Sequence, residues 1–218
     1  MKIGILGAGA IGGALAKLAA DRGYDVMISS RHPDSLAGLA TGMGVHTGSL
    51  EQAAGFGELC IAAIPLLSLN SLPVEKLAGR IVIDAMNYYP WRDGPIPPLD
   101  ERATTTSEFV AGRLPGAHLV KAFNAILARH LPDDARAPVP SGRRALPIAG
   151  NDPTANRIVA ELQDAFGFET LDTGPLSKSW RFERAKPAYC IPLDMDGLQR
   201  ALDTATRDGE LPDGSWRI

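Results

Sequence analysis

Short apolar runs alternate with segments of helical periodicity along the first half of the chain. Lys2–Leu6 and Asp25–Ser29 have the composition of buried strands, and Gly23 ends the helical segment between them. The apolar positions of that segment are Ile11, Ala14, Leu15, Leu18 and Ala19. Alternation of strand and helix is typical of a parallel sheet covered by helices.

The same alternation continues beyond this first unit. Further apolar runs predict strands at Leu59–Ile64, Ile81–Asp84 and His118–Phe123. Thr105 and Glu108 have the spacing of a capping box, which predicts a helix that begins there and runs to about Arg113.

A second unit of strand, helix and strand follows near the C-terminus. Asp152 as N-cap and Pro153 at the first helical position predict the start of its helix. The apolar positions of this helix are Ile158, Val159, Leu162 and Phe166. A short strand from Glu169 and a helix near Met195–Arg207 complete the pattern.

A glycine-rich sequence, GAGAIG, lies between the first strand and the first helix, and it matches G-x-G-x-x-G. Gly7 permits the tight turn, Gly9 allows a pyrophosphate close to the backbone, and Gly12 lets helix and strand pack closely. The N–H groups of Ala10 and Ile11 would point at the phosphates from the helix N-terminus. In this position the motif predicts dinucleotide binding; the alternative is a turn kept for packing alone.

These patterns together predict an α/β fold of the Rossmann type, with a doubly wound, mostly parallel sheet and a small C-terminal α/β extension. We expect residues 1–125 to form the nucleotide-binding domain. Residues 126–218 would form the extension, packed on that domain as one compact unit.

The end of the second strand lacks the acidic residue that binds the adenosine ribose of NAD. Ser30 is close to the usual place of that acid, and no carboxylate follows until Asp34. Arg31 can bind the 2′-phosphate of NADP, with Ser29 or Ser30 adding a hydroxyl. One charge-assisted hydrogen bond contributes about 1.5–3 kcal/mol, a preference of roughly ten- to a hundredfold. The sequence predicts NADP(H), with a solvated loop cation as the alternative.

Two later loops should lie at the same edge of the sheet. Ala63, Ile64 and Pro65 follow the strand across the switch point and should contact the nicotinamide half of the cofactor, unless Pro65 simply ends the strand. Asn87 follows the next strand, and an aromatic loop over residues 88–98 comes after it. This loop could form a wall for a planar substrate or pack on its own side chains.

Composition narrows the classes of function. The chain is 45% hydrophobic and 22% charged with a net charge of −3, which gives no support to nucleic-acid binding. Cys60 and Cys190 cannot build a disulfide framework, and the glycine-rich N-terminus is unlike a signal peptide or membrane span.

The histidines are scattered, so no metal site is predicted. Arg136, Arg143 and Arg144 could bind an anion or be merely solvated. We expect a cytoplasmic protein.

Three stretches carry a family resemblance: KIGILGAGAIGGALAKLAADRGYDVMISSR, LVKAFN and IAGNDPTANRIVAELQDAFGFETLDTGPLSKS. With them the chain resembles the NADP-dependent reductases of the deazaflavin coenzyme F-420, to which the cytosolic domains of membrane ferric reductases are related. The resemblance covers nearly the whole chain, and Ser30–Arg31 and Asp172–Ser179 are its more specific marks. It implies a homodimer with a small-molecule redox substrate.

The resemblance also implies where the ligands bind. The glycine-rich loop, Ser30, Arg31 and the Ile64–Pro65 loop would hold NADP. The planar coenzyme would lie over the nicotinamide, close to Asn87, Phe123, Asn124 and Leu176. The known deazaflavin reductases have a histidine where this chain has Phe123–Asn124, so the cofactor carries over better than the substrate.

Hydride transfer between two flat rings depends mainly on position and on exclusion of water, so no catalytic side chain is predicted. β-Hydroxyacid dehydrogenases need a long helical domain, whereas only 93 residues (218 − 125) follow residue 125. We therefore expect an NADPH-dependent oxidoreductase that acts on a planar partner such as F-420 or a flavin. The alternative is a module that binds NADP(H) and senses its redox state without turnover.

Overall fold

The computed structural model describes residues 1–135, 142–212 and 214–216. The strands are β1 (Lys2–Leu6), β2 (Asp25–Ser29), β3 (His46–Gly48), β4 (Leu59–Ala62), β5 (Ile81–Asp84), β6 (His118–Lys121), β7 (Ala145–Gly150) and β8 (Glu169–Asp172). The helices are α1 (Ala10–Asp21), α2 (Ala37–Met43), α3 (Leu50–Phe56), α4 (Val74–Leu77), α5 (Pro90–Asp93), α6 (Pro97–Asp100), α7 (Thr106–Ala111), α8 (His130–Asp134), α9 (Pro153–Phe166) and α10 (Met195–Thr204). Three 3₁₀ turns are η1 (Pro33–Leu36), η2 (Leu66–Ser71) and η3 (Leu176–Phe182).

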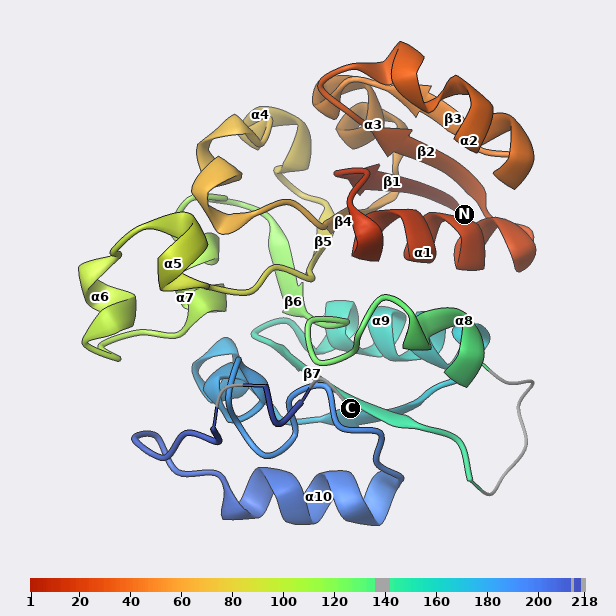
Figure 1. Cartoon of the computed structure of the whole chain (residues 1–218). Coiled ribbons are helices and arrows are strands. Elements are labelled where there is room, and N and C mark those ends of the chain that lie inside the picture. The colour runs from red at the N-terminus through yellow and green to blue at the C-terminus, as the bar shows by residue number, and fades with distance from the viewer. Residues whose placement is uncertain (136–141, 213, 217–218) are drawn as a thin grey trace.

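The strands form one sheet in the order β3-β2-β1-β4-β5-β6-β7-β8 (Figure 1). β7 runs antiparallel to β6, and the other neighbouring pairs are parallel. The order reverses where β1 lies between β2 and β4, and this is the switch point at which open α/β sheets bind their ligands. The predicted Rossmann-type α/β fold is confirmed.

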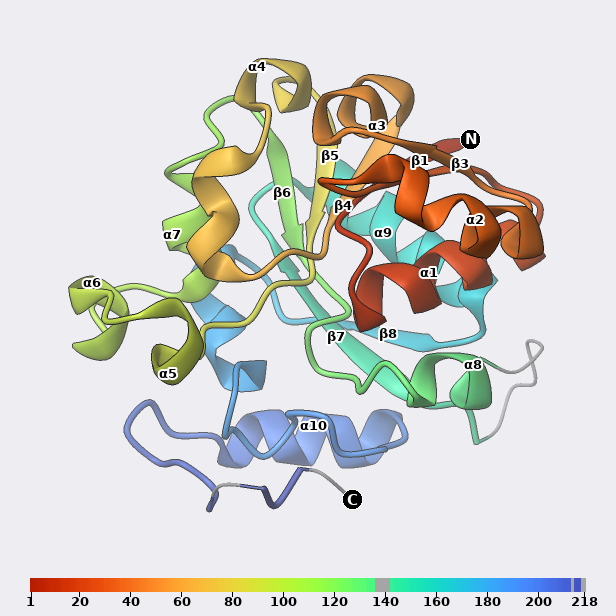
Figure 2. The ribbon, with the colours of Figure 1, turned by 45° about the horizontal axis from the view of Figure 1, so that its top comes forward.

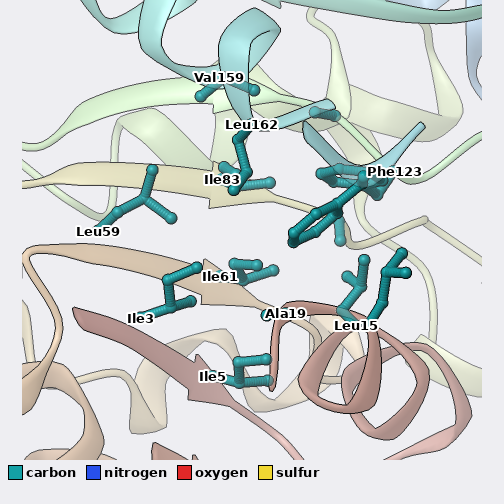
Figure 3. Close-up of a cluster of buried hydrophobic side chains, with 14 of the residues drawn as sticks. Ile3, Ile5, Leu15, Ala19, Leu59, Ile61, Ile83, Phe123, Val159 and Leu162 are labelled. Carbon is teal, nitrogen blue, oxygen red and sulfur yellow. The ribbon is translucent and has the colours of Figure 1, made fainter. Parts of the chain in front are cut away.

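Helices cover both faces of the sheet. α1 and α9 share one face, and their side chains meet those of β1, β4 and β5 in a single buried cluster (Figure 3). Each fully buried aliphatic side chain of this kind contributes roughly 1.5–3 kcal/mol. α3, α4 and α7 pack on the opposite face in a second cluster. The periodic apolar positions of the sequence therefore define the core.

The last part of the chain adds β7, β8 and α10 to the far edge of the sheet (Figure 2). Leu146 and Ile148 of β7 face the cluster of α9, whereas Ala145 and Ala149 face a third cluster that includes residues of α10. This alternation gives β7 two covered faces. The C-terminal α/β extension is confirmed, and the division of the chain at residue 125 stays a prediction.

Some predicted boundaries are wrong by a few residues. The strands expected to reach Ile64 and Phe123 end at Ala62 and Lys121. After β6 the chain turns through Phe123, whose φ of 58° lies in the left-handed region and cannot continue a strand. The short β3 was not predicted, because three residues are too few for a period. No helix in the described ranges is long and apolar enough to cross a lipid bilayer.

Candidate functional site

The glycine-rich loop joins β1 to α1, and its three motif glycines differ in their surroundings. Gly7 has a φ of 116°, and a Cβ there would lie 2.6 Å from the Ala63 carbonyl oxygen. A Cβ at Gly12 would lie 1.9 Å from the Gly7 carbonyl oxygen. A Cβ at Gly9 would meet nothing within 4 Å. Packing therefore requires Gly7 and Gly12, whereas Gly9 leaves open space beside the N-terminus of α1.

A buried hydroxyl ties this loop to the end of β2. Ser29 Oγ accepts a hydrogen bond of 3.0 Å from the Gly7 N–H, and its side chain is fully buried. Ser30 lies one residue further, and its Oγ accepts a bond of 3.1 Å from the His32 N–H. The sequence predicted that either Ser29 or Ser30 would donate its hydroxyl to the 2′-phosphate. In the structure the Ser29 hydroxyl instead binds the glycine-rich loop.

Arg31 is exposed at the start of the loop that follows β2. Within the described part of the chain its guanidinium has no hydrogen-bond or ion-pair partner. A cation in this position keeps all five of its donors for a ligand.

These segments enclose a cavity of about 300 Å³. It is lined by Gly7, Ala8, Gly9, Ser29, Ser30, Arg31, Leu36, Leu50, Ala63, Ile64, Pro65, Ser68 and Ser71. The structure therefore brings together most of the residues predicted to bind the cofactor. Ala10, Ile11 and Gly12 form the first turn of α1 directly after the loop.

Sequence reasoning missed two hydroxyl residues of this cavity. Ser68 and Ser71 belong to η2, the turn that follows the Pro65 loop. Their spacing of one 3₁₀ turn is the signal that could have found them, because residues i and i+3 of such a turn face the same way.

A second group of predicted residues meets at the ends of β5 and β6. Asn87 Nδ2 donates a hydrogen bond of 3.0 Å to the Asn124 carbonyl oxygen. Asn124 Nδ2 donates to the Phe182 carbonyl oxygen at 3.0 Å and to Asn87 Oδ1 at 3.3 Å. Asn124 Oδ1 is buried, and none of the described residues donates a hydrogen bond to it. The two amides thus form one linked pair at the carboxyl edge of the sheet.

The other two predicted substrate residues have buried side chains. Phe123 is 1% exposed and packs against Phe166, with ring centroids 5.9 Å apart. Leu176 is 2% exposed and belongs to the cluster on the opposite face. Their side chains serve packing in this structure. The left-handed φ of Phe123 is costly for a bulky residue, and such strain tends to occur where a site needs a defined geometry.

The aromatic residues of the loop after β5 differ in their surroundings. The Tyr88 phenol donates to Asp100 Oδ1 at 2.7 Å and accepts from the Ile96 N–H at 3.0 Å, so it folds the loop on itself. Burial and the bond to Asp100 raise the pKa of Tyr88. Tyr89 is half-buried and reaches out of the loop, and Trp91 is 77% exposed. Tyr88 therefore packs within the loop, and a wall for a planar substrate stays a prediction.

A buried ion pair lies behind this edge. Lys121 Nζ is 3.1 Å from Asp84 Oδ2, and both side chains are fully buried. Asp84 also accepts bonds from Ser107 Oγ at 2.7 Å and from the Met86 N–H at 2.9 Å, and Lys121 Nζ donates to the Met86 carbonyl oxygen. The pair thus fixes the backbone of Met86, directly before Asn87.

A third ionisable group, Glu183, lies near this pair. Its carboxylate accepts a bond of 2.8 Å from the Thr106 N–H. Burial raises the pKa of Glu183, and the positive charge of Lys121 opposes the rise.

The loop arginines considered for anion binding already have acidic partners. Arg143 pairs with Asp164 and Arg144 with Asp134, each at 2.7 Å. Arg136 lies outside the described residues.

A switch-point sheet with a glycine-rich loop and a hydroxyl–arginine pair after β2 defines a dinucleotide-binding protein of the Rossmann class. Comparison with known proteins narrows this class. The model of the family described as NADP oxidoreductase, coenzyme F-420-dependent, matches residues 2–88. The N-terminal part of the chain therefore matches this family of NADP-dependent oxidoreductases.

The chain is also similar to individual proteins along most of its length. Metalloreductase STEAP3 of Rattus norvegicus is 32% identical over 201 residues, which are 88% of this chain and 38% of the rat protein. A crystal structure of hypothetical protein SMa0349 from Sinorhizobium meliloti is 32% identical, with a TM-score of 0.71 and coverage of 89% of this chain and 90% of that one. A putative F-420-dependent NADP-reductase from Arthrobacter sp. FB24 is 28% identical, with a TM-score of 0.70 and coverage of 82% and 87%.

The chain spans less than half the length of the curated relatives it matches, 38% of the rat protein and 48% of the Escherichia coli protein YjhV. Imine reductases of 15–21% identity share the fold alone.

Proposed function

We propose that this protein is an NADPH-dependent oxidoreductase that transfers hydride between NADP(H) and a planar redox partner such as F-420 or a flavin. The observation that carries the proposal is the Arg31 guanidinium, without a protein partner in the described residues, at the cavity beside the glycine-rich loop. The match of residues 2–88 to the family model and the similarity to the putative F-420-dependent NADP-reductase from Arthrobacter support the same reaction class.

The residues of the cavity fit such a cofactor. Gly9 leaves the space that a pyrophosphate needs, and the N-terminus of α1 presents its first N–H groups there. Arg31 and Ser30 would hold the 2′-phosphate, and the loop of Ala63–Pro65 would contact the nicotinamide half. When bound, the cofactor supplies the hydride.

The substrate would lie at the carboxyl edge formed by β5 and β6. The linked amides of Asn87 and Asn124 offer hydrogen-bonding groups, and Tyr89 and Trp91 offer aromatic surface. Aromatic surface next to a few polar groups suits a flat heterocycle. The homodimer and the cytoplasmic location stay predictions.

A turnover assay tests the proposal. Purified protein is mixed with NADPH and, in turn, with F-420, FMN, a quinone and a ferric chelate; the last is included because the rat relative is named a metalloreductase. We expect oxidation of NADPH, followed at its absorbance, with at least one planar acceptor. Tight NADPH binding without any turnover would contradict the enzyme and support the redox-sensing module.

The same assay with variants tests the cofactor. Arg31→Asp should lower NADPH affinity by about ten- to a hundredfold, since it removes a charge-assisted bond, and should leave NADH affinity nearly unchanged. Arg157→Asp makes the same change of charge on the exposed face of α9 and is the control. Equal loss for both coenzymes would rule out the phosphate assignment.

A further inference from the structure

Two tyrosines that are 100 residues apart in the chain meet at the carboxyl edge of the sheet. The phenol oxygens of Tyr89 and Tyr189 are 2.5 Å apart, a hydrogen bond at the short end of the normal range. Tyr89 lies two residues after Asn87 at the end of β5. Tyr189 precedes Cys190, whose N–H donates to the carbonyl oxygen of Ala125, the residue after Asn124. The chain segments that carry the two phenols therefore reach the linked amides of the proposed substrate edge.

The two phenols differ in their access to solvent. Tyr189 is 2% exposed, and its ring packs edge-on against Trp216. Tyr89 is half-buried, so one part of its side chain is open to the surface. Tyr89 is thus the phenol of the pair that a ligand at this edge would meet first.

The two phenols also differ in the groups that surround them. Burial raises the pKa of Tyr189, and Cys190 and Tyr89 add to the rise, so Tyr189 keeps its proton across the physiological range. Its O–H is then available as a donor to the Tyr89 oxygen. The Arg92 guanidinium lies 4.6 Å from the centre of the Tyr89 ring, and the Asp93 carboxylate accepts the Tyr89 backbone N–H at 2.9 Å. The Arg92 guanidinium also pairs with the Asp93 carboxylate at 2.8 Å, so the Tyr189 hydroxyl is the one donor that the described residues place at the Tyr89 oxygen.

The proposed reaction needs a proton as well as a hydride. Full reduction of a planar acceptor adds two electrons and one proton as hydride, and a ring nitrogen or oxygen of the acceptor takes up a second proton. Among the other groups described at this edge, the side-chain amides of Asn87 and Asn124 are not acids, and the Glu183 carboxyl lies behind the edge, where it accepts the Thr106 N–H. Burial raises the pKa of the Cys190 thiol to about 12, which leaves it a weak donor.

We propose that Tyr89 is the proton donor of this reaction and that Tyr189 is a positioning residue that holds the donor and stabilises its anion. The inference rests on the proposed function. The Tyr89 O–H bond breaks as an N–H or O–H bond forms on the acceptor, while NADPH gives up hydride and becomes NADP⁺. The Tyr89 phenolate accepts a hydrogen bond from Tyr189 and regains its proton from water.

Substitution of each phenol breaks the same hydrogen bond from opposite ends, and this separates chemistry from support. Tyr89→Phe should lower kcat with F-420 or FMN by about a hundredfold or more, the usual contribution of a general acid. Tyr189→Phe should lower kcat by about tenfold or less, because the donor is still present. Tyr24→Phe removes the hydroxyl of a tyrosine whose ring packs against Phe166, away from the edge, and should leave kcat unchanged. Wild-type kcat should show a solvent deuterium isotope effect that Tyr89→Phe loses.

Two measurements without turnover complete the test. The melting temperatures of Tyr89→Phe and Tyr189→Phe should fall by similar amounts, and both variants should bind NADP⁺ as the wild type does. Equal loss of kcat in the two variants would mean a structural clamp and would overturn the inference, as would full activity of Tyr89→Phe. A wild type inactive with every acceptor would instead overturn the proposed function, and the inference with it.

Discussion

The glycines of the glycine-rich loop are needed for two different reasons, close backbone packing and space for a ligand, which the sequence motif does not distinguish. Gly7 and Gly12 are required by the protein itself, because a Cβ at either position would collide with backbone. Gly9 has no such neighbour, and its φ of −74° is open to any residue. We therefore propose that the requirement for glycine at this position comes from the ligand, and the two requirements can be tested apart.

Gly9→Ala should leave the fold intact and weaken cofactor binding. We expect a change in unfolding free energy of about 1 kcal/mol or less, the cost of alanine at an N-cap. NADPH affinity should fall at least tenfold, because the added methyl group occupies the space proposed for the pyrophosphate. Gly13→Ala is the matched control: it also points into open space, but inside α1, and should stabilise by about 0.5–1 kcal/mol with unchanged affinity. Urea denaturation and cofactor titration measure both quantities, and unchanged affinity in Gly9→Ala would contradict the assignment.

At the scale of elements, the buried charges of β5 and β6 position the proposed substrate edge. Asp84 and Lys121 are register partners in the parallel pair, and both bond the backbone of Met86. The turn that leaves β5, and with it Asn87, is thereby fixed. Replacement of one partner leaves an uncompensated buried charge, which is far more costly than replacement of both.

Lys121→Met should therefore lower the free energy of unfolding by about 3–5 kcal/mol. In the double variant Asp84→Asn with Lys121→Met, most of that loss should return, since neither charge of the pair remains. Urea denaturation of the wild type, both single variants and the double variant gives the coupling between the two sites. Additive losses would show that the pair contributes no coupling energy.

Also at the scale of elements, the sequence predicted what depends on local pattern and failed where contact is remote. The loop at Gly7–Gly12 and the capping box at Thr105 follow from adjacent residues, and the structure has both elements. The bond between Tyr89 and Tyr189 spans 100 residues, and no periodicity encodes it. The family resemblance placed Phe123 near the substrate, but its left-handed turn directs the ring into the core. Such contacts come from tertiary packing alone.

At the scale of the whole molecule, one buried cluster connects the two proposed parts of the chain. Phe166 of α9 belongs to the extension, and its ring contacts Tyr24 and Phe123 of the first part, with centroids 6.0 and 5.9 Å apart. β6 and β7 are also paired across the boundary. A core shared in this way favours unfolding as one cooperative unit, in spite of the different roles of the two parts.

Phe166→Ala tests this cooperativity, because it opens a cavity where the two parts meet. We expect the free energy of unfolding to fall by about 3–5 kcal/mol, the usual range for a fully buried phenylalanine. If the chain is one unit, amide hydrogen exchange in β1 and in β7 should accelerate by the same factor, since both strands open in the same event. Ile158→Ala, at a half-buried position of the same helix, is the control and should have a much smaller effect in both strands. Faster exchange confined to β7 and β8 would show that the extension unfolds on its own and that residue 125 marks a true boundary.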